Sequence, residues 1–162
     1  LPLEHPAPMS EYQHYAFAAV ERPLTADQVS DLREVEKRAT VNPTRFVAEY
    51  HSGDLDERPE DLLIEHFDVH TYVSSWGTAE LVLKLPQGAL ERDVVKPYLV
   101  EERVEVRAKP GLLLLTLQAP LFGLGYRPLL HGLLLSLRPE LSGSLRLTLW
   151  LVLGGPLEAS LR

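Results

Sequence analysis

One short run of the sequence has residue types and spacing that suit a metal site, namely His66, Asp68 and His70. The two histidines are four residues apart, which on one helix places both imidazoles on the same face, as divalent-metal sites require. The same run is expected to change from helix to strand near Phe67, and that change would turn the two rings apart. We therefore favour solvated histidines near a helix end, with no metal bound.

A second polar run adds His51 and Asp54 to the metal hypothesis. The acidic residues after Gly53 resemble the oxygen ligands of a calcium loop, but the bidentate Glu that ends such a loop is missing at the required offset. An acidic surface turn is the favoured interpretation. A metal-dependent hydrolase that uses His66, Asp68 and His70, with His51 and Asp54, is the alternative hypothesis.

Aromatic residues supply the other candidate chemistry, which is binding rather than catalysis. Tyr72 and Trp76 belong to a set of aromatics on expected strands, and alternate aromatics on a strand normally form core. Trp76 differs because Gly77 follows it, and this dipeptide supplies the positive φ of a tight hairpin turn. A large aromatic residue on a turn is often partly exposed. We expect any binding surface to include Trp76, Gly77 and Tyr72.

The elements that position these residues begin with a strongly signalled helix. Thr25 and Gln28 form a capping box, and Leu24 and Val29 occupy the positions of a hydrophobic staple. Apolar residues then recur at helical spacing, which predicts a long capped helix over residues 26–39 with one face packed on a sheet.

The remaining pattern predicts strands and short helices. A short helix is expected over residues 59–67, where Pro59 suits a first helical position, and one or two helical turns over 89–95. Strands are predicted over residues 12–20, 45–51, 69–75, 78–85, 104–108 and 112–118. The fold class is therefore α+β: an antiparallel sheet with one long capped helix and one or two short helices.

Composition divides the chain into three parts. Residues 1–8 contain three prolines and are expected to be an irregular leader before Met9. Residues 9–118 are acidic and of mixed polarity, and they are predicted to form a single α+β domain. Residues 119–162 are rich in Leu and contain neither Lys nor Asp. This tail has two explanations that the sequence leaves open: a shifted reading frame, or added strands.

Charge and cysteine content exclude several classes of function. The formal net charge of −7 argues against a nucleic-acid surface, which needs clustered cations. The absence of Cys rules out thiol redox chemistry and is compatible with the cytoplasm. The most apolar run, residues 110–126, is interrupted by Pro120, Gly123 and Gly125, so a membrane span is not expected. Membrane association through the tail is a third hypothesis.

Several motifs lie in order between residues 9 and 86: Met9–Gln13, Arg22–Thr25, Pro43–Val47, Gly53–Asp54, Phe67–Asp68, Trp76–Thr78 and Leu83–Pro86. Together they resemble a family of uncharacterised bacterial proteins. The resemblance implies a cytoplasmic bacterial protein and transfers no catalytic residue.

Taken together, the sequence favours a non-enzymatic cytoplasmic protein-interaction domain. The acidic surface and the absence of a convincing catalytic constellation motivate this hypothesis. No cofactor is expected, and the oligomeric state is not indicated. A protein is the expected kind of partner.

Overall fold

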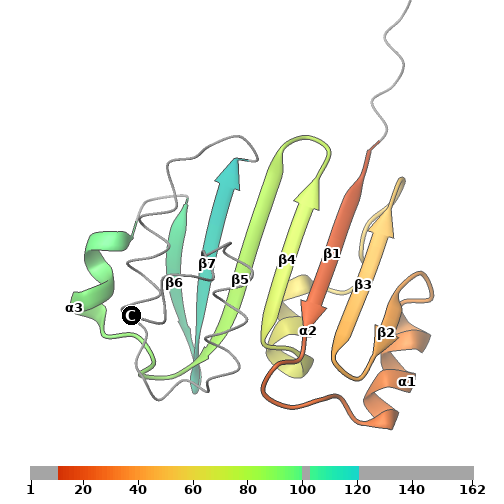
Figure 1. Ribbon diagram of the computed structural model, residues 1–162, viewed down its shortest axis with the longest axis horizontal. Helices are drawn as coiled ribbons and strands as arrows, with labels where there is room; N and C mark the ends of the chain where they lie inside the picture. The colour runs from red at the N-terminus through yellow and green to blue at the C-terminus, as the bar shows by residue number, and fades with distance from the viewer. Residues whose placement is uncertain (1–10, 100–102, 121–162) are drawn as a thin grey trace, which may run out of the picture.

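Seven strands form one antiparallel sheet in the order β2-β3-β1-β4-β5-β7-β6 (Figure 1). The computed structural model describes residues 11–99 and 103–120 of the 162-residue chain. The strands are β1 Gln13–Ala18, β2 Thr40–Asn42, β3 Arg45–Tyr50, β4 Val69–Ser74, β5 Thr78–Pro86, β6 Val104–Lys109 and β7 Leu112–Pro120. The helices are α1 Ala26–Val35, α2 Pro59–His66 and α3 Arg92–Val95, and the short 3-10 helix η1 follows at Lys96–Tyr98.

The predicted capping box opens α1 as expected. The Gln28 amide donates to Thr25 Oγ1 at 3.2 Å, and the Thr25 amide donates to Gln28 Oε1 at 2.9 Å. These two bonds satisfy amides that have no partner within the helix. The start of the helix was therefore readable from local sequence alone.

The predicted length of this helix is wrong, because α1 ends at Val35 and not at residue 39. Glu36 leaves the helical conformation, with φ −123° and ψ 92°, and its buried carboxylate accepts hydrogen bonds from Tyr50 Oη at 2.7 Å and from the Arg38 amide at 2.9 Å. The tertiary contact with β3 is thus more favourable than continuation of the helix. Residues 36–39 form a turn instead, and β2, a strand that the sequence did not predict, follows it at Thr40–Asn42.

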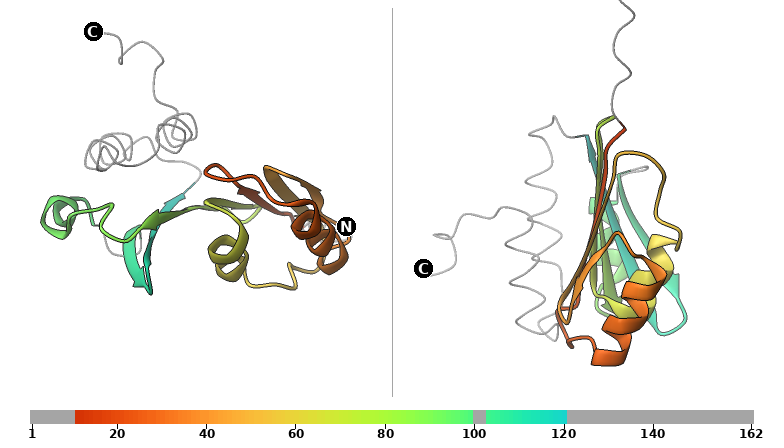
Figure 2. Two further views of the ribbon diagram at one scale, coloured as in Figure 1. Left: turned by 90° about the horizontal axis from the view of Figure 1, so that it is seen from below. Right: turned by 90° about the vertical axis from the view of Figure 1, so that its right-hand side faces the viewer.

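Helices α1 and α2 cover the same face of the sheet (Figure 2), α1 beside β2 and α2 beside β4. The core beneath them is aromatic. Phe17 lies 5.4 Å from Phe46 and 5.3 Å from Phe67 between ring centroids, and all three are at most 1% exposed. Among the described residues, neither α1 nor α2 extends over β7 and β6, so that part of the face is left without a helix (Figures 1 and 2).

A second apolar cluster lies on the opposite face of the sheet. Leu81 and Leu83 of β5 belong to it, whereas Val82 between them belongs to the first cluster, as strand alternation requires. Residues before and within α3 complete this second cluster. Its buried members are Val69, Leu81, Leu83, Leu85, Ala89, Leu90, Val95, Val104, Leu115 and Leu117.

Both predicted hairpins are present. The β4–β5 turn contains Gly77 with φ +92°, and the β6–β7 turn contains Gly111 with φ +78°. The antiparallel α+β class is therefore confirmed, with short helices. The predicted leader lies outside the described residues, as does the predicted tail except for Ala119 and Pro120, which continue β7.

Candidate functional site

The β4–β5 turn presents the predicted binding residue Trp76 to solvent. Trp76 is 52% exposed, one of three large apolar side chains among the described residues that are exposed to this degree, with Val35 and Leu99. Gly77 donates its amide to Ser74 O at 3.2 Å and closes the turn. The side chain therefore projects from a turn that is closed by its own backbone.

Tyr72, the third predicted binding residue, faces the helix-bearing side of β4 instead of solvent. Its hydroxyl donates to Gln13 Oε1 at 2.9 Å, and Gln13 Nε2 donates to Gly53 O at 3.0 Å. Burial raises the pKa of the Tyr72 hydroxyl above its ordinary value. Tyr72 thus belongs to an internal hydrogen-bond network, and Trp76 alone of the two aromatics is available to a partner.

A cavity of about 180 Å³ lies on the helix-bearing face, between the first turn of α2 and strands β5, β7 and β6. Its floor follows one row across the sheet, because His70 pairs with Val82, Val82 with Thr116, and Thr116 with Glu105. The sequence analysis did not find this site, since its residues come from five separate segments. The lining consists of Pro59, Glu60, Leu63, His70, Glu80, Val82, Glu105, Arg107, Thr116 and Gln118.

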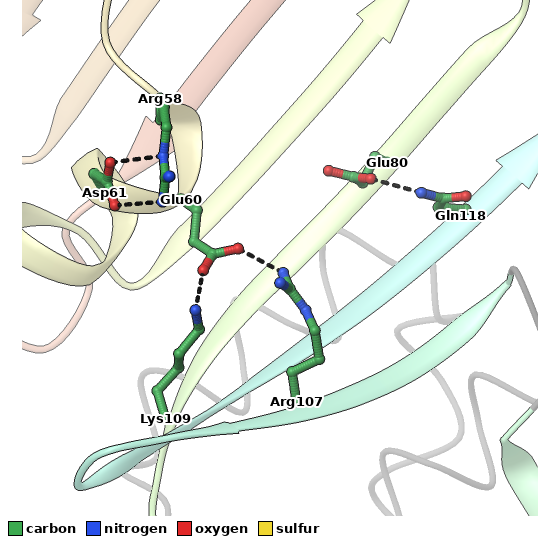
Figure 3. Close-up of polar contacts among 7 residues, drawn as sticks. All are labelled: Arg58, Glu60, Asp61, Glu80, Arg107, Lys109 and Gln118. Atoms are coloured by element: carbon green, nitrogen blue, oxygen red, sulfur yellow. Dashed lines mark hydrogen bonds and ion pairs between the residues drawn. The ribbon is translucent and has the colours of Figure 1, made fainter.

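An ion triad closes the cavity beside α2. Glu60 accepts from Arg107 Nη2 at 2.6 Å and from Lys109 Nζ at 2.5 Å (Figure 3). The hydrogen bond from Lys109 lowers the pKa of the Glu60 carboxyl, against the opposing effect of partial burial, and Arg107 adds to the shift. Both cations therefore share the single carboxylate of Glu60, so the triad keeps a net charge of +1, and Arg107 Nε is buried without a hydrogen-bond partner among the described residues.

The floor of the cavity contains polar side chains that are almost fully buried. His70 is 2% exposed, and its Nδ1 lies 3.2 Å from Ala16 O. Because a carbonyl oxygen only accepts, Nδ1 carries the proton, and in the neutral ring the lone pair is on Nε2. Burial lowers the pKa of His70 to about 4, so the ring is neutral near pH 7. Thr116 is 7% exposed and makes no side-chain hydrogen bond to any described residue.

The far wall of the cavity carries a carboxylate that no cation pairs with. Gln118 Nε2 donates to Glu80 Oε2 at 2.8 Å, and Figure 3 shows these two side chains facing each other across β5 and β7. No ion pair to Glu80 or Glu105 is found within the described residues. The cavity therefore combines two carboxylates that have no cationic partner among the described residues with His70 Nε2 and the Thr116 hydroxyl.

The residues of the metal hypothesis are divided between two sites. His66 and Asp68 line a second cavity of about 270 Å³ with Lys84, whereas His70 lines the first. Asp68 Oδ2 accepts from the amides of Val20 and Glu21 at 2.7 and 2.9 Å, which ties the chain after β1 to the start of β4. Within residues 11–99 and 103–120, no three His, Cys, Asp or Glu side chains are grouped to hold a metal ion.

The lysine of this second cavity has a structural role. Lys84 Nζ donates to Ile64 O near the end of α2 at 3.2 Å and lies 3.8 Å from Asp68 Oδ1. Burial lowers the pKa of Lys84, and the Asp68 carboxylate opposes this shift. The lysine therefore fastens the end of α2 to the sheet.

His51 and Asp54, the additional residues of the metal hypothesis, are engaged elsewhere. Asp54 Oδ1 accepts from the Tyr15 hydroxyl at 2.5 Å, and the ring of His51 lies 5.3 Å from that of Tyr12. Burial, followed by the hydrogen bond to Asp54, raises the pKa of Tyr15. The loop that carries both residues is thus fixed to β1.

The chain matches no protein-family model, no curated protein and no solved structure. In the described part of the chain, no helix has the length and apolar character needed to cross a membrane.

Proposed function

We propose that this chain is a non-enzymatic domain that binds another protein in the cytoplasm, with Trp76 as the central contact. The observation that carries the proposal is the exposure of Trp76, 52% of its surface, on the β4–β5 turn. Tryptophan is enriched among the few residues that dominate binding energy at protein interfaces, because a single side chain removes a large apolar area from water.

The turn that carries Trp76 is held in place before any partner arrives. Ser74 Oγ accepts from the Thr78 amide at 3.2 Å, and the amide of Ser75 donates to Tyr12 O at 2.9 Å. The Tyr12 amide returns a hydrogen bond to Ser75 Oγ at 3.0 Å. A preorganised contact residue loses less conformational entropy on binding, which favours affinity.

The charge of the chain supports a partner with a basic surface. The formal net charge is −7, and the exposed Glu49, which accepts from the Tyr12 hydroxyl at 3.3 Å, lies near the same end of the sheet as Trp76. Complementary charge accelerates encounter and disfavours acidic partners. The absence of Cys in the sequence is in keeping with the reducing cytoplasm.

Affinity capture with matched variants tests the proposal. The full chain, Trp76→Ala and Val35→Ala are immobilised and the bound proteins are compared; Val35 is the control because it is an exposed apolar residue on α1, 49% exposed. A partner retained by the wild type and by Val35→Ala is expected to bind Trp76→Ala roughly thirtyfold more weakly or worse. An identical set of partners for Trp76→Ala and wild type, with both folded by circular dichroism, would overturn the proposal.

A further inference from the structure

We propose that the cavity between α2 and strands β5, β7 and β6 binds the guanidinium group of an arginine side chain. This inference rests on the proposed function, because it assigns the arginine to the protein partner. It extends that function from one aromatic contact to a second site of defined chemistry.

The hydrogen-bonding groups left over in the cavity are mainly acceptors, although Arg107 Nε is a buried donor that has no partner among the described residues. His70 has its proton on Nδ1, so Nε2 is an acceptor, and the Gln118 amide nitrogen is used by Glu80, which leaves the Gln118 carbonyl oxygen. Thr116, a residue that is 7% exposed, contributes a hydroxyl that has no hydrogen-bond partner among the described residues. A buried polar group without a partner is unfavourable unless a ligand or water satisfies it. A ligand that donates several hydrogen bonds therefore complements most of these groups.

The charge of the lining selects a cation. Glu60, Arg107 and Lys109 form a triad of net charge +1, whereas the two carboxylates of Glu80 and Glu105 line the cavity without a cationic partner in the described part of the chain. The five groups together carry a net negative charge. An anionic ligand would meet both carboxylates and is disfavoured. A ligand that is a cation and also donates several hydrogen bonds fits the guanidinium group, which has five N–H groups and no acceptor. An ammonium group has three donors and is more strongly hydrated, so it loses more hydration free energy when it enters a partly buried site.

The size and the apolar part of the cavity agree with an arginine side chain. A cavity of about 150 Å³ holds a benzene molecule, so the volume of about 180 Å³ suits a guanidinium with part of its methylene stem. Pro59, Leu63 and Val82 provide apolar lining for that stem. Arginine side chains commonly bury their methylene groups along such surfaces.

The cavity is within reach of the turn that carries Trp76. Glu80 follows Trp76 by four residues, which spans at most about 14 Å of extended chain. Glu80 and Gln118 pair across β5 and β7 at this end of the cavity. One partner surface can therefore cover Trp76 and place an arginine in the cavity.

The test titrates the full chain with N-acetyl-arginine amide, N-acetyl-lysine amide and N-acetyl-citrulline amide, and follows the backbone amides of Glu80, Thr116 and Gln118 by NMR. Citrulline has nearly the shape of arginine without its charge. We expect saturable shifts with the arginine probe, binding about tenfold weaker for the lysine probe, and no binding of the citrulline probe. Absence of shifts with the arginine probe, or equal binding of arginine and citrulline, would overturn the proposal without any variant.

Variants then locate the site. Thr116→Val and Glu80→Gln are each expected to weaken the arginine probe about tenfold, whereas Glu34→Gln, at an exposed position on α1, leaves its affinity unchanged. Equal effects of Glu80→Gln and Glu34→Gln would place the probe elsewhere and overturn the assignment. If Glu80→Gln does not fold, the comparison of probes on the wild type still decides the question.

Further results distinguish a protein from a small molecule as the source of the guanidinium group. They also distinguish failure of this inference from failure of the proposed function. Free L-arginine that binds at least tenfold more tightly than the amide-capped probe would assign the site to a small molecule and overturn the assignment to a protein. If Trp76→Ala loses its partner but no arginine probe binds, this inference fails and the proposed function stands. If the arginine probe binds but Trp76→Ala keeps every partner, the proposed function fails and the guanidinium site remains.

Discussion

The helix-bearing face of the sheet has two halves with opposite character. Over β3 and β1, α1 and α2 seal an aromatic core in which Phe17, Phe46 and Leu63 are at most 1% exposed. Over β5, β7 and β6, the same face carries Glu80, Thr116 and charged residues around a cavity. The side chains of the first half pack against one another, whereas in the second half the Thr116 hydroxyl has no hydrogen-bond partner and Glu80 and Glu105 have no cationic partner among the described residues. This difference is why we place the proposed binding site in the second half and assign the first to stability.

His70 lies at the boundary between the two halves. Its ring stacks on Phe17 with 4.2 Å between centroids, and the same residue lines the cavity. The sealed half therefore fixes the position of one wall of the open half. Substitutions on either side of this residue should have separable effects on stability and on binding.

The largest expected effect is that of Phe17→Ala in the sealed half. Phe17 is 1% exposed and contacts the rings of Phe46 and Phe67, so the substitution removes buried apolar surface and leaves a void. We expect the free energy of unfolding to fall by about 3 to 5 kcal/mol, measured by urea denaturation. A loss below about 1 kcal/mol would show that this half is not the packed core and would break the comparison.

The second prediction concerns the pH dependence produced by His70. Its pKa is about 4 in the folded protein and near 6.5 in the unfolded chain, so between these values the unfolded state binds a proton that the folded state does not. The contribution of neutral His70 to the free energy of unfolding is fully present above pH 6.5. It falls as the pH decreases toward 4, by about 3 kcal/mol in total. In His70→Phe, which keeps a ring against Phe17, we expect this part of the decrease to disappear.

The measurement is urea denaturation at several pH values between 4 and 7. His51→Phe serves as the control, because it makes the same substitution at an exposed position. If the His70→Phe and wild-type stabilities stay parallel over this range, His70 is not buried as a neutral ring, and its role as a hydrogen-bond acceptor in the cavity fails with it.

The third prediction is a smaller effect confined to the sealed half. Thr25→Ala removes the hydroxyl that accepts from the Gln28 amide at the start of α1. The expected loss of stability is about 1 kcal/mol by denaturation. Binding of the arginine probe should not change, since α1 does not line the cavity. A weakened affinity would show that the two halves are coupled.

The two halves also differ in how far the sequence predicts them. The sealed half follows from local rules: the capping box at Thr25 and Gln28 sets the start of α1, and alternation along residues 45–51 predicts β3. The end of α1 does not follow from such rules, because Glu36 leaves the helix to bind Tyr50, which is fourteen residues away. Helical spacing could not report that contact, and the strand β2 was missed with it.

The open half depends on strand pairing and not on local pattern. His70, Val82, Thr116 and Glu105 become neighbours only through the register of β4, β5, β7 and β6. The hairpins were predicted, but a one-residue change of register would turn each of these side chains to the other face. The sequence therefore indicated the exposed Trp76 through its turn, whereas the cavity required the assembled sheet.

The smallest expected effect on stability, Thr116→Val, gives the sharpest test of the comparison. The substitution keeps the shape of the side chain and removes a hydroxyl that has no partner among the described residues. In the sealed half, removing a buried hydroxyl would break a hydrogen bond and lower the free energy of unfolding by about 1 kcal/mol or more. Here no protein hydrogen bond is lost, so we expect a change within about 0.5 kcal/mol, with either sign. A loss above 1 kcal/mol would mean that the hydroxyl already has a partner inside the protein, and the cavity would then belong to the sealed half.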